Sequence, residues 1–435
     1  MKTTLAFLLV LLSTGALAQV YPGLRVVGRH LVSPCNDTVM IRGVNKMVVW
    51  TGDLDLRKKS YAEIKKTGAN CIRIVWLAQP GQFEFDATPE GLDRNIQDAI
   101  DAGLIPMVEL HDATGDWSKL SMVVDYWTRP DVVAVVKKHE RYMLLNIANE
   151  AGDETVTDQQ FIAGYTTAIQ RIRATGIKTP LIIDGADWGK NLEQLVRTAP
   201  TITMMDEMRN IMYSVHTYWA VSDGANAAFI AQQFTSAVES GLPFIVGEFT
   251  NLFNRNGGCT YETAYQGILA TCAQYKIGWL AWEWGPGNEF ADPTCDVMNM
   301  TTNSYYETLK DGWAKTVAET SPHSIKETSV SSYFVMHKGA CDPVSVQDQG
   351  VQFEVAVVSP NPSAGAINAT YTMGNAGTVR IEIINSVGAL ITTFTQHHGQ
   401  PGTYTVPIKV DMSGMYYSRI TLPSHTIVMP FVIVR

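Results

Sequence analysis

Two glutamates, Glu150 and Glu248, each follow a short apolar run of the sequence, so both are candidates for the same kind of position in the fold. A pair of carboxyl groups can hydrolyse the acetal of a glycosidic bond. One protonates the departing oxygen, and the other supplies negative charge to the anomeric carbon. A glutamate at a strand end is more often a salt-bridge partner or a loop cap. The pair therefore indicates catalysis only if the fold brings both residues to one site.

Other polar and aromatic candidates also stand where apolar runs end; they are Asn45, Arg73, His111, Asn149, Asp184, His216, Thr217, Tyr218 and Trp282. A guanidinium at Arg73 could pair with any buried acid, or it could keep a nucleophilic carboxylate ionised. His111 and His216 could be buried histidines or metal ligands, but no His-x-x-x-His spacing accompanies them. Trp188 and Trp282 could be core residues, or they could offer a face to the C–H surface of a sugar.

Motifs for other chemistries are absent from the sequence, which contains no G-x-S-x-G, G-x-x-x-x-G-K-[ST], G-x-G-x-x-G or H-E-x-x-H string. The six cysteines show no C-x-x-C spacing. We therefore expect acid/base chemistry with no cofactor and no metal. Six cysteines allow fifteen pairings. Cys259 with Cys295 is one pair that would tie two loops together on one face.

Eight apolar runs can position these side chains; they cover residues 39–45, 70–76, 105–111, 143–149, 180–184, 212–216, 243–248 and 278–284. Successive runs start 31 to 38 residues apart, which is the length of one strand-plus-helix unit. Eight such units predict a (β/α)8 TIM barrel over residues 19–341, and a doubly wound open sheet is the competing α/β arrangement. In a barrel the active site lies at the carboxyl ends of the strands. The candidates would then form one ring.

Segments between the runs carry helix signals. Thr88 and Pro89 open a segment with a stripe of apolar residues, and Gly103 closes it before the third run. A second segment ends at Gly68 before the second run. Strands that alternate with such helices predict a parallel sheet covered by helices.

The composition changes after Cys341, where proline, serine, glycine and threonine become frequent. Alternating strands are expected at residues 353–358, 379–384, 390–394, 404–410, 415–422 and 428–434. They predict a small all-β sandwich over residues 351–435, with a linker over 342–350.

Residues 1–18 show the basic start, apolar centre and small-residue cleavage pattern of an export signal peptide. Without Lys2, 32 basic residues face 42 acidic ones, for a net charge near -10, and no basic run offers a surface for nucleic acid. No later segment is apolar for the roughly twenty residues that a membrane span needs. We expect an exported protein with no nucleic-acid partner and no membrane span.

Residues 24–320 resemble glycoside hydrolase family 5, and within it the bacterial endo-β-1,4-mannanases. The matching motifs are Gly43 to Asn45, Cys71 to Val75, Val108 to Gly115, Asn146 to Glu150, Ile183 to Gly189, Ser214 to Tyr218, Ile245 to Phe249 and Gly278 to Trp282. The string from Glu109 to Gly115 is typical of the mannanase branch rather than of the cellulases.

The resemblance implies that Glu150 donates the proton and Glu248 attacks the anomeric carbon in a retaining double displacement. It also implies that Arg73 and Tyr218 hold Glu248 and that Asn149 binds the sugar 2-hydroxyl. The implied substrate is a β-linked polysaccharide such as mannan, glucomannan or cellulose.

The same resemblance places His111 and His216 along the subsite of cleavage, Trp282 as its stacking platform and Trp188 near the cleft. The sequence departs from the mannanase pattern at Glu283, where a small hydroxyl residue is usual, and in the three residues after Glu150. These departures concern the substrate preference and leave the catalytic pair untouched. The alternatives are an endo-β-1,4-glucanase of the same family, a binding protein that keeps the cleft without turnover, and a metal-dependent barrel hydrolase.

The last hundred residues resemble the sorting domain of the bacterial type IX secretion route, through Ser359 to Ser363, Val379 to Gly388 and Ser413 to Tyr417. A carbohydrate-binding sandwich is the alternative, but this segment has few aromatic residues and no tryptophan. The resemblance implies a partner in the secretion machinery and a location outside the cell or at its surface.

Overall fold

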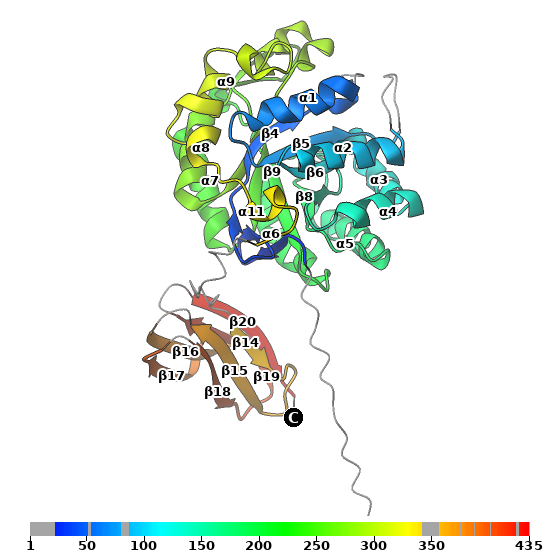
Figure 1. Cartoon of the computed structure of the whole chain (residues 1–435). Helices are drawn as coiled ribbons and strands as arrows, with labels where there is room; N and C mark the ends of the chain where they lie inside the picture. The colour runs from blue at the N-terminus through cyan, green and yellow to red at the C-terminus, as the bar shows by residue number, and fades with distance from the viewer. Residues whose placement is uncertain are drawn as a thin grey trace, which may run out of the picture. The chain divides into compact units, whose positions relative to one another are not determined.

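In the computed structural model, eight parallel strands close into a barrel that helices surround (Figure 1). In chain order the strands are β4 (Arg42–Lys46), β5 (Cys71–Trp76), β6 (Ile105–Leu110), β7 (Leu144–Asn146), β8 (Leu181–Asp184), β9 (Ile211–His216), β10 (Phe244–Glu248) and β13 (Gly278–Ala281). The last strand pairs with the first, so the predicted (β/α)8 barrel is confirmed and the open sheet is wrong. Every residue of these strands is buried, as expected for a parallel sheet covered by helices.

The structure describes residues 22–50, 54–79, 87–341, 356–373, 376–386, 388–400, 402–422 and 426–434. The chain divides into two units, Met1–Asp342 and Pro343–Arg435. The predicted signal peptide (1–18) and linker (342–350) lie outside the described residues.

Helices connect the barrel strands; they are α1 (Leu54–Lys65), α2 (Pro89–Asp101), α3 (Leu120–Trp127), α4 (Pro130–His139), α5 (Asp158–Ala174), α6 (Leu192–Met204), α7 (Ala227–Glu239) and α8 (Tyr265–Tyr275). The predicted start of α2 is confirmed, since the Thr88 hydroxyl caps the N–H of Gly91 and Pro89 is the first helical residue. Three short helices follow the last barrel strand; they are α9 (Trp313–Lys315), α10 (Ile325–Thr328) and α11 (Tyr333–Met336). None of the helices in the described residues is long and apolar enough to cross a membrane.

A small antiparallel sheet of β1 (Arg25–Val27), β2 (His30–Val32) and β3 (Thr38–Val39) precedes the barrel, and the sequence analysis did not predict it. Its Leu31 and Val39 pack with Leu24 and with residues at the amino ends of the barrel strands, such as Ile105. A disulfide joins Cys35 in this region to Cys341. These contacts close the end of the barrel opposite to the predicted catalytic residues.

A hairpin of β11 (Leu252–Asn254) and β12 (Cys259–Glu262) leaves the barrel after β10. A disulfide joins Cys259 to Cys295 in the 3-10 helix η6 (Pro293–Met298), so the structure contains the pair that the sequence analysis singled out. Cys71 and Cys272 are buried free cysteines.

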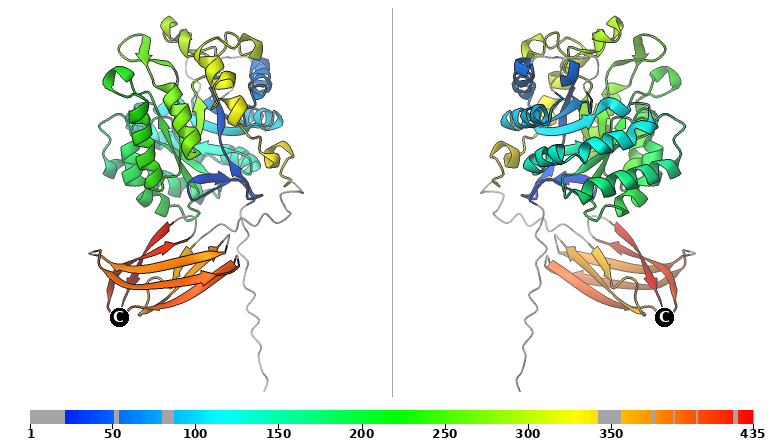
Figure 2. Two further views of the ribbon diagram at one scale, coloured as in Figure 1. Left: turned by 90° about the vertical axis from the view of Figure 1, so that its left-hand side faces the viewer. Right: turned by 90° about the vertical axis from the view of Figure 1, so that its right-hand side faces the viewer.

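The second unit consists of two antiparallel sheets (Figure 2). One sheet has the order β14-β15-β18 and the other the order β17-β16-β19-β20. The strands are β14 (Ala356–Ser359), β15 (Ala366–Met373), β16 (Gly377–Asn385), β17 (Leu390–His398), β18 (Gly402–Lys409), β19 (Gly414–Thr421) and β20 (Thr426–Ile433). Apolar residues from both sheets share one core, so the predicted all-β region is confirmed.

Strand β15 was missed by the sequence analysis. Its buried positions Ile367, Ala369, Tyr371 and Met373 alternate with polar or small residues. Alanine and asparagine are poor strand formers, so the local propensity of this segment does not predict a strand. Pairing with β14 and β18 stabilises it.

Candidate active site

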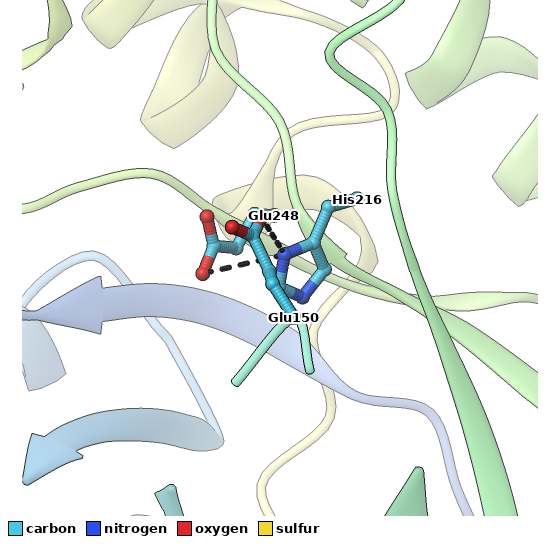
Figure 3. A group of neighbouring side chains, drawn as sticks. All are labelled: Glu150, His216 and Glu248. Carbon is cyan, nitrogen blue, oxygen red and sulfur yellow. Dashed lines mark hydrogen bonds and ion pairs between the residues drawn. The ribbon is translucent and has the colours of Figure 1, made fainter. Parts of the chain in front are cut away.

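The two predicted glutamates lie at the carboxyl end of the barrel, and both carboxyl groups approach the same ring nitrogen of His216 (Figure 3). The Nδ1 atom of His216 is 2.6 Å from Oε1 of Glu150 and 3.5 Å from Oε1 of Glu248. One polar atom from each of the three side chains lies within 4.8 Å of the others. Both glutamates are buried. Their carboxyl groups are therefore close enough to act on one acetal carbon.

Glu248 is the last residue of β10, but Glu150 lies beyond the end of its strand, since β7 already ends at Asn146. Glu150 has a φ of +45°, which is unusual for a residue other than glycine. Its N–H donates to Oδ2 of Asp184 over 3.2 Å, and its carbonyl accepts from the N–H of Gly115 over 2.9 Å. Contacts from the end of β8 and from the loop after β6 thus hold the strained backbone that orients this side chain.

Arg73 is fully buried and organises the polar side chains at the mouth of the barrel. Its guanidinium donates to Oε1 of Glu248 (2.7 Å), Oδ1 of Asn149 (2.6 Å), Oδ1 of Asn146 (3.0 Å), Oδ1 of Asn45 (3.1 Å) and Oδ2 of Asp184 (3.2 Å). The bond to Oδ1 of Asn149 directs the Nδ2 group of that amide away from Arg73, where it donates to the Thr114 hydroxyl over 2.8 Å. Arg73 therefore fixes both a carboxylate and an amide at the mouth.

Glu248 has a second direct partner, since the Tyr218 hydroxyl donates to its Oε2 over 2.6 Å. Burial raises the pKa of Glu248 to about 7, although Arg73 and the Tyr218 hydroxyl act to lower it. Burial and the negative charge of Glu248 raise the pKa of Glu150 well above the usual range of a carboxyl group. The two environments therefore favour ionisation of Glu248 before that of Glu150.

His216 is held by the close packing of two glycines against its ring. A Cβ atom at Gly189 would lie 2.7 Å from Cγ of His216, and one at Gly247 would lie 2.8 Å from its Nε2. Burial, together with the positive charge of Arg73, lowers the pKa of His216 well below the usual histidine value. The imidazole is therefore neutral, and its orientation is fixed.

His111 and Trp282 form a second aromatic group at the mouth. Their rings lie 6.0 Å apart and nearly parallel. Burial alone would lower the pKa of His111, but its 2.9 Å hydrogen bond to Oε1 of Glu109 and the charge of that carboxylate raise it overall. The Trp282 Nε1–H donates to Oδ1 of Asn288 over 2.9 Å, which fixes the plane of the indole.

A cavity of about 740 Å³ opens beside Glu150. Its lining includes Trp188, Tyr218, Trp219, Phe253 and Arg255, from the loops after β8 and β9 and from the β11–β12 hairpin. Trp188 is 40% exposed, so a large aromatic face is available to a ligand. Glu150 lines this cavity and Glu248 does not.

Glu150, His216 and Glu248 form the one group of acidic and histidine side chains that could hold a metal ion within the described parts of the chain. Arg73 donates to Glu248 at 2.7 Å and so already places a positive charge beside that carboxylate. A cation bound to the three residues would be repelled by this guanidinium. The donor set therefore fits proton transfer better than metal binding.

The structure brings all nine predicted site residues to the same end of the barrel: Arg73, His111, Asn149, Glu150, Trp188, His216, Tyr218, Glu248 and Trp282. Glu109 was not assigned to the site from the sequence. It lies two residues before His111, and the two-residue period of a strand puts both side chains on the same face, so this spacing could have identified it. Asn146 on β7 and Phe253 on β11 lie in strands of three residues, which are too short to show an alternation. The cavity residues Trp219 and Arg255 lie in loops, where no periodicity is expected.

Comparison with known proteins gives a family and several relatives. The family model described as cellulase (glycosyl hydrolase family 5) matches residues 33–288. A mannan endo-1,4-beta-mannosidase of Cellvibrio japonicus (strain Ueda107) is 30% identical over 302 residues, which are 68% of this chain and 65% of that protein. A mannan endo-1,4-beta-mannosidase of Salipaludibacillus agaradhaerens is 29% identical, over 60% of this chain and 81% of that protein. The crystal structure of a beta-mannanase from Streptomyces thermolilacinus has a TM-score of 0.62 at 27% identity, and the match covers 72% of this chain and 99% of that one.

Proposed function

The chain belongs to glycosyl hydrolase family 5, and from this premise we propose that it is a retaining endo-β-1,4-mannanase that cleaves mannan or glucomannan. The observation that carries the proposal is the placement of Glu150 and Glu248, whose carboxyl oxygens approach within 4.8 Å. Retaining enzymes hold their two carboxyl groups about 5 to 5.5 Å apart, whereas inverting ones leave about 6.5 to 9.5 Å for a water molecule. The names of the relatives support mannan as the substrate.

In the first step, a carboxylate oxygen of Glu248 attacks the anomeric carbon while Glu150 gives its proton to the glycosidic oxygen. The bond between the anomeric carbon and that oxygen breaks, and its electron pair leaves with the protonated oxygen. An ester then joins Glu248 to the sugar. Because Glu150 is the acid with the higher pKa, it carries the proton that this step consumes.

In the second step, the ionised Glu150 removes a proton from a water molecule, whose oxygen attacks the anomeric carbon. The ester bond breaks and Glu248 leaves as a carboxylate. The ester removes the negative charge of Glu248, which had raised the pKa of Glu150. The pKa of Glu150 therefore falls when the residue must act as a base.

The contacts of Arg73 and Tyr218 with Glu248 support a role for both in keeping the nucleophile ionised and oriented. Asn149, fixed by Arg73, would bind the 2-hydroxyl of the sugar under attack. His111, His216 and Trp282 would line the same subsite. The cavity beside Glu150 lies on the side of the proton donor, so it would accept the departing sugars, with Trp188 as a stacking surface.

The proposal is tested with Glu150→Gln and Glu248→Gln on linear mannan, with Glu63→Gln outside the site as the control. Each site variant should lose at least about a hundredfold in kcat, and the control should not. Proton NMR of the first products should show the β-anomer, as retention requires. Unchanged hydrolysis in both site variants would refute the assignment, and binding of mannan by the wild-type protein without cleavage would indicate a binding protein.

An endo-β-1,4-glucanase is the second candidate, since the matching family is described as cellulase. The two substrates differ in the orientation of the 2-hydroxyl group. Initial rates on linear mannan, glucomannan and a soluble cellulose separate the candidates. We expect the rate on mannan to be the highest, and a higher rate on cellulose would select the glucanase.

We further propose that residues 1–18 are a signal peptide, that residues 342–350 form a linker and that residues 351–435 sort the protein through the type IX route to the cell surface or the medium. The sequence motifs of the C-terminal segment and its all-β fold support this proposal. To test this proposal, the full chain and a chain without residues 351–435 are expressed in a host that has the type IX route. The shortened chain should accumulate inside the cell envelope, and its appearance in the medium would contradict the sorting role.

A further inference from the structure

Asp184 is a fully buried carboxyl group that the double displacement does not use, although it contacts both halves of the site. Its Oδ2 accepts from the backbone N–H of Glu150 and from Nη2 of Arg73, each over 3.2 Å. Its Oδ1 accepts from Nδ2 of Asn146 over 3.1 Å. Burial raises the pKa of Asp184, but Arg73 and the other N–H donors directed at its carboxyl group act against this rise and favour the anionic form. Asp184 thus presents negative charge to its other neighbours.

The nearest of these neighbours is His216. Its Nε2 has no hydrogen-bond partner within the described part of the chain, and Oδ2 of Asp184 lies 3.5 Å away. This separation is long for a hydrogen bond, but it permits a strong interaction between a charge and an N–H dipole in a buried site. The ring cannot turn to another orientation, because Gly189 and Gly247 pack against it.

A neutral imidazole has one N–H and one lone pair, and the group facing one nitrogen selects the tautomer. A hydrogen on Nε2 would point toward the Asp184 anion, whereas a lone pair there would face that anion and be repelled. The lone pair then belongs on Nδ1, which is 2.6 Å from Oε1 of Glu150 and 3.5 Å from Oε1 of Glu248. Arg73 and the Tyr218 hydroxyl donate to Glu248 and offset its charge, so the shorter contact with Glu150 decides the role of Nδ1. At that distance Nδ1 accepts a hydrogen bond from a protonated Glu150.

We propose that Asp184 is a positioning residue that holds His216 in the Nε2–H tautomer and so keeps the general-acid proton on Glu150. The proposal rests on the proposed function for its kinetic consequences. Its structural content, the tautomer of His216, can be measured without a substrate.

Asp184→Asn removes the negative charge that favours the Nε2–H tautomer. The substitution retains every other titratable or charged group that faces Glu150, Asp184 and His216. These groups are Arg73 on β5, Glu109 and His111 at the end of β6, Tyr165 on α5, Tyr218 after β9 and Glu248 on β10. Loss of the Asp184 charge lowers the pKa of Glu150 directly, and so does loss of the Nδ1 acceptor. Activity requires protonated Glu150, so the alkaline limb of the pH profile should move to lower pH.

The kinetic test compares kcat/KM of Asp184→Asn on linear mannan and on 2,4-dinitrophenyl β-mannobioside, whose leaving group departs without a proton. The loss on mannan should be about a hundredfold, with a much smaller loss on the aryl glycoside. Equal losses on both substrates, or an alkaline limb that does not move, would overturn the proposal.

Asp206→Asn is the matched control, because Asp206 is also buried and paired with an arginine, Arg173 at 2.9 Å, but lies outside the site. Asp206→Asn should change kcat/KM on mannan and on the aryl glycoside by the same factor, and it should not move the alkaline limb of the pH profile. If it shifts that limb as Asp184→Asn does, the effect is not specific to the tautomer and the proposal fails.

Nitrogen-15 NMR of histidine-labelled wild-type protein tests the tautomer itself and does not depend on a folded Asp184 variant. The His216 signals are assigned by their absence in His216→Gln. We expect Nε2 to carry the hydrogen and Nδ1 to show the shift of an unprotonated nitrogen. A hydrogen on Nδ1 would overturn the inference even if the protein hydrolyses mannan, whereas inactivity with the expected tautomer would overturn the proposed function alone.

Discussion

At the scale of single residues, the site must keep one carboxyl group protonated and ionise another a few ångströms away. Burial raises the pKa of both Glu150 and Glu248, so burial by itself does not distinguish them. The difference comes from Arg73 and Tyr218, which contact Glu248 directly. Because the two groups interact strongly, the ionisation of Glu248 raises the pKa of Glu150 and separates the two limbs of the pH profile.

Replacement of Tyr218 by phenylalanine tests this account. The hydroxyl lowers the pKa of Glu248, so its loss should raise that pKa above the value of about 7. Activity requires ionised Glu248, and the acidic limb of kcat/KM should therefore move to higher pH. A hydrogen bond to a charged group contributes about 1.5 to 3 kcal/mol, which corresponds to a loss of roughly tenfold to hundredfold at the optimum.

Tyr213→Phe is the control for this substitution. The Tyr213 hydroxyl on β9 is buried and bonds to the Ala199 carbonyl and the Thr203 hydroxyl, away from the glutamates. This variant should lose stability without a change in the acidic limb. An unshifted limb in Tyr218→Phe would show that the hydroxyl does not control ionisation of Glu248.

At the scale of elements, the barrel strands supply the polar ring and the loops supply the cavity. Arg73 and Glu248 lie on β5 and β10, where neighbouring strands fix their positions. The wall of the cavity depends instead on the β11–β12 hairpin, which the Cys259–Cys295 disulfide joins to η6. Phe253 on this hairpin lines the cavity.

The double variant Cys259→Ser/Cys295→Ser should lower both stability and substrate binding. The disulfide closes a loop with a sequence separation of 36, for which chain entropy predicts a contribution of about 4 kcal/mol. Because the hairpin forms the cavity wall, KM for mannan should rise more than kcat falls. Thermal unfolding and steady-state kinetics measure the two effects.

Cys35→Ser/Cys341→Ser provides the comparison, since that disulfide lies at the opposite end of the barrel. It should lower the unfolding temperature and leave KM unchanged. If both double variants change KM alike, the hairpin disulfide has no particular role in the cavity.

At the scale of the whole molecule, the two units have separate hydrophobic cores. The barrel core and the core of the all-β unit share no residue. A unit with its own core can unfold on its own. All the candidate site residues belong to the first unit.

A chain that ends at residue 342 should therefore keep the kcat/KM of the full chain on soluble mannan. Calorimetry of the full chain should show two transitions, and the shortened chain should retain the one that belongs to the barrel. Loss of activity, or a marked fall in the temperature of the remaining transition, would show that the second unit stabilises the first.

The sequence alone determined the barrel and the ring of candidates. Apolar runs such as 70–76 and 105–111 recur at the spacing of one strand and one helix, and burial of a parallel sheet requires that pattern. It also determined the all-β character of the C-terminal segment. Strand β15 was not predicted, because its alanine and asparagine residues make the alternation of apolar and polar positions weak.

Only the tertiary structure decided the contacts of His216 and Asp184. The 2.6 Å contact of His216 with Glu150 and the three N–H donors around Asp184 join residues that lie far apart in the chain. Hydrogen-bond geometry and pKa shifts depend on distances of a few tenths of an ångström and on burial. Residue spacing along one strand carries no information about hydrogen-bond geometry or pKa shifts, because neighbouring strands and loops determine these distances and this burial.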